Sequence, residues 1–368
     1  MITYKRHIGI KQLLGGKGEF RIENLLPKGK MLFSSAIRLG LLDVIDSLCF
    51  SKNECVMLPP ICPQGLYIPF NRKKIPIRFY HLKDNFAVDT KWLEDSLEDI
   101  NNCKVFIFIH YFGIYNPQVV EIKELCTKHK MILIEDAVQG LFSTDHEGVP
   151  LGSIGDISLF SFPKFLPVPD GAAFVINNPQ LNIVFSYKKN LLVYLSRFFH
   201  SNSLLWNNLI TDDTNGIPYK IIKAFSLFNY ALYYFLLCLA KQNQDISKMS
   251  RRILSGIDYD DYLARRHRIL QCYNSGLYQY EYRQKVQNFS GYLLEVKEND
   301  TKDVIKELNR LGLETLSYIK GWNYVPDTEE FEYERFLLRH HLLLPINADV
   351  PLSAYEQKMQ KIKSILNR

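Results

Sequence analysis

Short apolar runs alternate with a helical pattern between residues 55 and 177, and this alternation is typical of an α/β fold. The candidate strands are Cys55–Pro59, Ile75–Tyr80, Lys104–Ile109, Met131–Glu135, Asp156–Phe162 and Ala172–Ile176. A helix is predicted from Pro117 to Lys130, because apolar residues recur on one face and proline is favourable in a first helical turn. Strands separated by helices of this length need crossover connections, which predicts a mainly parallel central sheet.

The chain after residue 250 has the pattern of a second, smaller α/β unit. A helix is predicted over Tyr259–Cys272, a β-like stretch over Asn288–Val296, and a last helix over Leu352–Leu366. We therefore predict a large domain over residues 1–250 and a small C-terminal domain over residues 251–368.

The stretch from Leu181 to Ser250 is helical in pattern and rich in aromatic residues. Within it, Ala224–Ala240 (AFSLFNYALYYFLLCLA) is apolar almost all round, and its length is at the lower edge of a membrane-spanning helix. It also contains a serine, an asparagine and three tyrosines, and no flanking pattern sets an orientation. We expect this segment to be buried in the protein or at a subunit interface. Association with a membrane surface and a true span are the alternatives.

Composition narrows the range of partners. Of the 368 residues 47% are hydrophobic, and 45 basic against 39 acidic residues give a net charge of +6. This mild excess suits an anionic small molecule, and no basic run with interleaved aromatics predicts nucleic-acid binding. Seven cysteines without a CxxC pair argue against a metal site or a disulfide framework and favour a reducing cytoplasm. Residues 1–20 lack the long apolar core of a signal peptide.

Polar side chains follow three of the candidate strands at the point where each strand ends. His110 follows the strand KVFIFI, Asp136 and Gln139 follow MILIE, and Ser161 and Lys164 follow DISLF. In an open α/β sheet, ligands bind beyond the carboxyl ends of the strands. These side chains are therefore expected to converge on one rim of the sheet.

The chemistry of this set is complementary. A lysine amine such as that of Lys164 can condense with an aldehyde, and a carboxylate such as that of Asp136 can keep a pyridine nitrogen protonated. The run Ser34-Ser35-Ala36 precedes a helical pattern, and hydroxyls and free amides at a helix start can hold a phosphate. Taken singly, these residues also suit ordinary roles as helix caps or surface lysines. Their order and spacing together predict a site for pyridoxal 5′-phosphate (PLP).

Three blocks of sequence resemble the PLP-dependent nucleotide-sugar aminotransferases of the DegT/DnrJ/StrS group. They are Ile134–Gly140 (IEDAVQG), Gly152–Phe162 (GSIGDISLFSF) followed by Lys164, and the strand end at His110–Gly113. Similar family landmarks are Val56–Pro60, Arg251–Asn274 and Leu343–Val350. The resemblance implies a fold type I PLP-dependent transferase, a homodimer, and glutamate or glutamine as the amino donor.

Carried over by position, the resemblance assigns Lys164 as the Schiff-base lysine and Asp136 as the partner of the pyridine nitrogen. It places Gln139 near the cofactor ring and Ser161 at the phosphate. Three departures mark a divergent branch: a short Ser161-to-Lys164 spacing, a phosphate loop without glycine or threonine, and Pro63 near the place of the usual stacking aromatic. His110, or the tyrosine that follows it, is our candidate for that stacking role.

We therefore predict an aminotransferase that converts a nucleotide-linked keto sugar into an amino sugar. The main alternative is a PLP-fold protein with altered chemistry, or one that serves as a non-catalytic binding subunit. Related sugar dehydratases carry histidine where this chain has Lys164, which argues against dehydration. A dinucleotide-dependent oxidoreductase would need GxGxxG after a strand, and the cluster Gly15-Gly16-Lys17-Gly18 lacks that spacing.

Overall fold

A seven-stranded sheet forms the centre of the molecule. The computed structural model describes residues 2, 22–97, 102–207, 209, 217–277, 291–296, 301–315 and 322–367. Across the sheet the strands are β1 (Lys30–Ser34), β9 (Ala172–Ile176), β8 (Ile157–Ser161), β7 (Ile132–Asp136), β6 (Cys103–Ile109), β2 (Cys55–Leu58) and β3 (Ile77–Phe79). The strands from β8 to β3 are parallel, and β9 is antiparallel to both of its neighbours. The predicted mainly parallel sheet is confirmed.

Each of the six candidate strands corresponds to a strand of this sheet, whereas β1 was not predicted. Strands β2 and β9 are buried along their whole length, and β7 and β8 each have one half-buried end residue. Burial on both faces explains why their sequences read as continuous apolar runs instead of alternating patterns. Strand β1 has a mixed burial pattern and follows no helical crossover, so its sequence gives a weaker signal.

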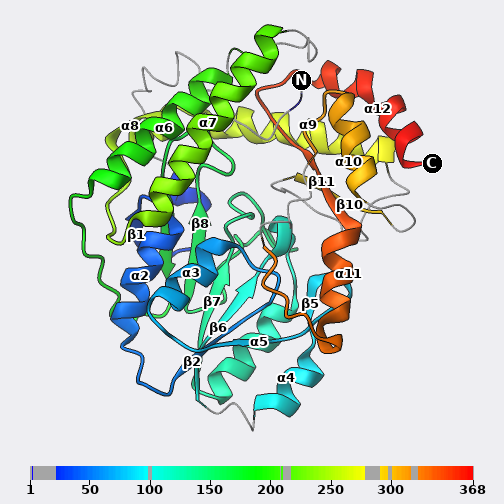
Figure 1. Cartoon of the computed structure of the whole chain (residues 1–368). Helices are drawn as coiled ribbons and strands as arrows, with labels where there is room; N and C mark the ends of the chain where they lie inside the picture. The colour runs from blue at the N-terminus through cyan, green and yellow to red at the C-terminus, as the bar shows by residue number, and fades with distance from the viewer. Residues whose placement is uncertain are drawn as a thin grey trace.

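Helices cover both faces of the sheet and continue into a C-terminal layer (Figure 1). They are α2 (Ile37–Leu48), α3 (Gln64–Arg72), α4 (Thr90–Leu97), α5 (Gln118–Lys128), α8 (Lys248–Ser255), α9 (Tyr259–Leu277), α10 (Thr301–Arg310), α11 (Glu332–His340) and α12 (Leu352–Leu366). Two small sheets pair β10 (Gly291–Glu295) with β11 (His341–Pro345), and β4 (Leu82–Lys83) with β5 (Ala87–Val88). One hydrophobic core runs from Leu41 to Ile362 through both halves of the chain. The division at residue 250 stays a prediction.

Helices α6 (Leu191–Asn207) and α7 (Ile217–Leu239) form a long hairpin on one side of the molecule (Figure 1). Helix α7 includes most of the apolar segment Ala224–Ala240. Over Lys220–Leu239 it is long and apolar enough to cross a membrane by length and composition, yet only 17% of its most apolar window is buried in the chain. The segment is therefore not buried within the chain itself, because the hairpin projects from the core, and burial at a subunit interface stays a prediction.

One disulfide was not predicted. Cys55 and Cys103 are bonded between neighbouring strands β2 and β6, with their Cα atoms 4.6 Å apart. The remaining five cysteines are free. Sequence spacing could not suggest this pair, because the two residues are 48 positions apart and meet only through the strand order.

Candidate active site

Asp136 is the last residue of β7, and its side chain is 3% exposed. Its carboxylate accepts a hydrogen bond from the Val138 N–H at 2.9 Å. The preceding residue, Glu135, points to the opposite face because side chains alternate along a strand. There Glu135 accepts a hydrogen bond from the Ile154 N–H at 2.8 Å. Only one of the two adjacent acids is thus directed toward the rim where Lys164 lies.

Lys164 lies beside Asp136, since β7 and β8 are parallel neighbours whose ends meet at the same rim. Burial lowers the pKa of the Lys164 amine to about 8, although the nearby carboxylate of Asp136 acts in the opposite direction. Burial likewise raises the pKa of Asp136, opposed by the charge of Lys164. A buried amine with a lowered pKa is neutral in a larger fraction of molecules, which is the form that attacks a carbonyl.

A cavity of about 500 Å³ opens over these two residues. This volume lies in the range of pockets that hold cofactors and drug-sized ligands. The predicted residues that line it are Ser35, Ala36, Asp136, Ser161 and Lys164. The residues that line it without having been predicted include Arg38, Gln64, His200, Tyr230, Tyr233, Tyr234, Leu237 and Trp322.

The start of α2 forms one end of the cavity. Ala36 is the N-cap of α2, and no side chain caps it. The Ser35 hydroxyl is buried and has no hydrogen-bond partner among the described residues. The guanidinium of Arg38, in the first turn, lies 4.7 Å from the ring centroid of Tyr234. An uncapped helix start, an unpaired hydroxyl and a cation at one end of a cavity are the groups that an anion such as phosphate needs.

Ser34 lies beside this end but faces elsewhere. Its hydroxyl donates to the Asn243 side chain at 2.7 Å and accepts from the Ala36 N–H at 3.2 Å. Ser34 does not line the cavity, because the chain alternates direction at the end of β1 and only the next residue faces inward.

His110 and Gln139 also lie outside the cavity lining. His110 is buried, with its Nε2 2.8 Å from Glu135, and Gln139 accepts a hydrogen bond from the Phe112 N–H at 2.9 Å. Both side chains therefore stabilise the strand ends below the cavity. The turn between them is tight, because Gly113 has a φ of +86° and lies directly against the Gln139 backbone.

The ring of Trp322 lies close to Lys164 at the cavity. The lysine Nζ lies 5.5 Å from the centroid of the Trp322 ring. The Cys62 N–H donates a hydrogen bond to the Trp322 carbonyl at 3.1 Å. This bond brings the segment around Trp322 to the end of β2. The sequence suggested His110 or Tyr111 for the stacking role. The aromatic residue that lines the cavity beside Lys164 is instead Trp322, which lies so far along the chain that no local spacing could reveal it.

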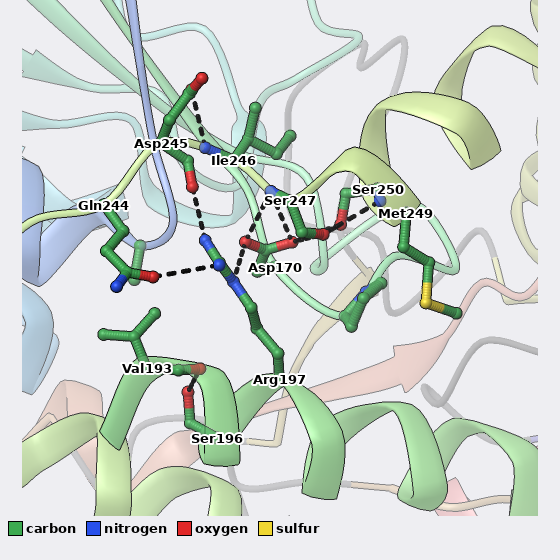
Figure 2. Close-up of polar contacts among 12 residues, drawn as sticks. Asp170, Val193, Ser196, Arg197, Gln244, Asp245, Ile246, Ser247, Met249 and Ser250 are labelled. Carbon is green, nitrogen blue, oxygen red and sulfur yellow. Dashed lines mark hydrogen bonds and ion pairs between the residues drawn. The ribbon is translucent and has the colours of Figure 1, made fainter. Parts of the chain in front are cut away.

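The loop that carries Lys164 is fastened to the hairpin through Asp170 (Figure 2). The Asp170 carboxylate is 2.7 Å from Arg197 Nε on α6 and accepts a hydrogen bond from the Ser247 hydroxyl at 2.6 Å. It also accepts one from the hydroxyl of Ser250 in α8. A buried acid with these partners fixes the loop between Lys164 and β9 against both α6 and α8.

No cluster of three or more potential metal ligands is found in the described parts of the chain. The groups that line the cavity include an amine, one carboxylate, hydroxyls and aromatic rings.

Comparison with known proteins agrees with this geometry. Residues 81–190 match the model of the DegT/DnrJ/EryC1/StrS aminotransferase family. The chain is 33% identical over 107 residues to a UDP-4-amino-4,6-dideoxy-N-acetyl-β-L-altrosamine transaminase of Campylobacter jejuni. That alignment covers 28% of this chain and 28% of the relative.

Solved structures extend the likeness over the whole chain. DesI, solved in the presence of its TDP-sugar product, superposes with a TM-score of 0.71 at 15% identity and covers 100% of this chain and 93% of its own. The PMP form of Spr1654 from Streptococcus pneumoniae gives a TM-score of 0.65 at 17% identity and covers 99% of this chain and 92% of its own. At this low sequence identity, the structural similarity shows the fold alone.

The fold is that of the fold type I PLP-dependent aminotransferases. Residues 81–190 add a sequence match to the DegT/DnrJ/EryC1/StrS aminotransferase family.

Proposed function

We propose that this protein is a PLP-dependent aminotransferase that converts a nucleotide-linked keto sugar into an amino sugar. The observation that carries the proposal is the placement of Lys164 and Asp136 at one cavity, each from the end of a neighbouring parallel strand. The relatives described above act on, or were solved with, nucleotide sugars. The mild positive charge of the chain agrees with a diphosphate-bearing substrate.

The residues present fit PLP. The unpaired hydroxyl of Ser35 and the uncapped start of α2 would hold its phosphate, together with Ser161. Asp136 would hold the proton on the ring nitrogen, and Trp322 lies where it would cover the ring next to Lys164. When bound, PLP supplies an aldehyde for amines and a ring that withdraws electrons from the substrate carbon.

Lys164 has two tasks in this proposal. Its amine would bind the cofactor covalently while the site awaits an amino donor. Once freed, the neutral amine would accept a proton at Nζ from the donor and release that proton again to the product. The lowered pKa supports both tasks, because an amine that is protonated in every molecule could neither attack nor accept a proton.

Three further assignments rest on resemblance. We propose glutamate or glutamine as the amino donor, a homodimer as the assembly, and a role in polysaccharide biosynthesis in the cytoplasm. Gln139 and His110 retain supporting roles, because both fix the strand ends that present Asp136.

A non-catalytic binding subunit is the second candidate. It is favoured by the phosphate end of the cavity, where the Ser34 hydroxyl is engaged with Asn243 and faces away from the cavity. A weak phosphate site would lower the affinity for PLP without removing the fold.

Reductive labelling separates the two candidates. Purified protein mixed with PLP should develop the visible absorbance of a lysine-bound cofactor, and borohydride should fix the cofactor on Lys164 in a peptide map. Lys164→Ala should abolish both signals and lower turnover by several orders of magnitude, while Lys128→Ala, an exposed lysine of α5, should change neither. Labelling on another lysine would refute the assignment, and no labelling at all would favour the non-catalytic protein. Turnover is then measured as keto-acid release from glutamate with UDP- and TDP-keto sugars.

A further inference from the structure

The α6–α7 hairpin carries most of the exposed apolar side chains of the molecule. Of the 19 large hydrophobic side chains that are exposed in the described residues, 13 lie on these two helices. On α7, exposed residues recur at three-, four- and seven-residue steps at Ile217, Ile221, Phe225, Phe228, Phe235 and Leu239. This spacing places them along one stripe of the helix. We call the exposed apolar stripes of α6 and α7 the outer face.

On α6 the same arrangement recurs. Leu191, Leu195, Phe198 and Leu205 are between 37% and 70% exposed and follow one another at three-, four- and seven-residue steps. The residues buried on the opposite side of this helix include Ser196, His200 and Ser203. Apolar patches of this size are uncommon on soluble monomers and mark a surface that binds something.

The contact between the two helices includes a buried polar cluster. The Ser203 hydroxyl donates to the Ser226 carbonyl at 3.0 Å, and the Ser226 hydroxyl donates to the Asn207 side chain at 2.6 Å. All three residues are at most 1% exposed. Small hydroxyl and amide side chains inside with large apolar ones outside reverse the pattern of a hairpin in water. This is the packing of helices whose surroundings are lipid.

Charge on the hairpin points to the same surroundings. Neither α6 nor α7 contains an aspartate or glutamate. Lys220 and Lys223 lie on α7, Lys188 and Lys189 precede α6, and Lys241 follows α7. Basic side chains beside an apolar helix face attract the negative surface of a bilayer that contains anionic lipids.

A second copy of the chain fits this surface less well. A symmetric dimer brings the same patch of two chains together. Two copies of these helices would then meet, and neither α6 nor α7 supplies an acidic side chain to offset the exposed Lys220. Such a contact would repel where an anionic bilayer attracts.

The hairpin also cannot cross the bilayer as a whole. The C-terminal part of α7 is fastened to the body, because Arg72 donates to the Ala240 carbonyl at 2.7 Å and Tyr234 donates to the Gln64 side chain. Its inner side lines the cavity at Tyr233 and Leu237. A helix attached in this way lies on a membrane with one face inserted.

We propose that the outer face of the α6–α7 hairpin binds the surface of an anionic lipid bilayer and holds the protein there as a peripheral membrane protein. This binding goes beyond the proposed transamination and does not depend on it. The outer-face residues named above do not line the cavity, so a failure of one proposal leaves the other intact.

Vesicle flotation tests the proposal. The full chain, with PLP, is mixed with neutral vesicles of phosphatidylcholine or with anionic vesicles that also contain phosphatidylglycerol. The protein should float with the anionic vesicles, and Phe225→Gln with Phe228→Gln should lower the bound fraction about tenfold or more. Val120→Gln, at an exposed apolar position of α5 that is 46% exposed, is the matched control and should float like the parent.

A charge variant supplies the second arm. Lys220→Glu with Lys241→Glu, at two exposed lysines, should remove the preference for anionic over neutral vesicles, and the preference of the parent should weaken as salt is raised. Far-ultraviolet circular dichroism confirms that each variant is folded. Failure of the folded parent to float with either vesicle would overturn the proposal. So would equal binding to both vesicles, or an outer-face variant that converts a dimer into a monomer, which would identify a second copy as the occupant.

Discussion

Lys164 and Asp136 are both buried at the cavity, and the charge of each opposes the pKa shift that burial causes in the other. Lys164 and Asp136 come from different strands and were both identified from the sequence, because each follows a strong apolar strand. The sequence also indicated Ser35, Ala36 and Ser161, which line the cavity. Their roles toward the cofactor remain proposals.

The lowered pKa of Lys164 predicts how cofactor attachment depends on pH. Because the neutral amine attacks, attachment of PLP should speed up about tenfold per pH unit below pH 8 and level off above it. Asp136→Asn removes the charge that raises the lysine pKa, so the midpoint should move to lower pH. This variant should still attach the cofactor but lose turnover, since a neutral partner does not hold the ring proton. Stopped-flow absorbance over pH 6 to about 10 measures the midpoint. A midpoint near the ordinary lysine value would contradict the burial of this amine.

Replacement of Gly113 should destabilise the fold, because its site has no room for a Cβ atom. A Cβ placed there would lie 2.1 Å from the Gln139 carbonyl oxygen, and its φ is +86°. Gly148 has a φ of +84° but nothing within 4 Å of its Cβ position, so it is a matched control for backbone strain alone. Gly148→Ala should cost about 1–2 kcal/mol of unfolding free energy, and Gly113→Ala about 2 kcal/mol more. Urea denaturation gives both values. Equal costs would mean that the turn can open.

At the scale of elements, the apolar strands and the helices α5, α9 and α12 were predictable, whereas α3 was not. Buried strands such as β6 can be predicted from their apolar composition, because both of their faces are covered. Helix α3 carries Pro69 inside it and starts at Gln64 without a side-chain cap, so its sequence has no clear beginning. The segment that contributes Trp322 is placed by pairing with residues near Cys62, a long-range contact that local patterns cannot encode.

The ion pair between Arg197 and Asp170 joins two elements, and its loss should be costly. Arg197→Ala leaves a carboxylate that is 4% exposed without its guanidinium, which should lower the unfolding free energy by about 3 kcal/mol. Arg251, whose pair with Asp245 is exposed on both sides, is the control, and Arg251→Ala should cost about 1 kcal/mol or less. Denaturant titration of the cofactor-free protein distinguishes them. Equal losses would show that Asp170 is held by its serine partners alone.

At the scale of the whole molecule, the sequence predicted the fold class, whereas the assembly rests on resemblance alone. The α/β class and the mainly parallel sheet follow from patterns in the sequence, and neighbours with TM-scores of 0.65 to 0.71 share the fold. The hairpin was the exception. Its apolar sequence indicated burial, but the position of a helix relative to a core depends on packing partners that the segment itself does not contain.

The assembly is predicted to be a homodimer that does not use the outer face. Light scattering in mild detergent should give twice the chain mass of 43.0 kDa. The mass should be unchanged by Phe228→Gln, because the proposed occupant of that face is lipid. A monomer mass at micromolar concentration would refute the homodimer.

Helix α7 separates the cavity from the outside at this point. Its residues Tyr233 and Leu237 line the cavity, and Phe228 and Phe235 are exposed on the outer face. A wall about 10 Å across has no second layer to absorb a displacement. Amphiphiles that bind the outside should therefore change the width of the cavity as well as the solubility of the protein. A detergent chosen to keep the protein in solution can then act as an inhibitor that does not compete with substrate, and its identity becomes a variable in every kinetic assay.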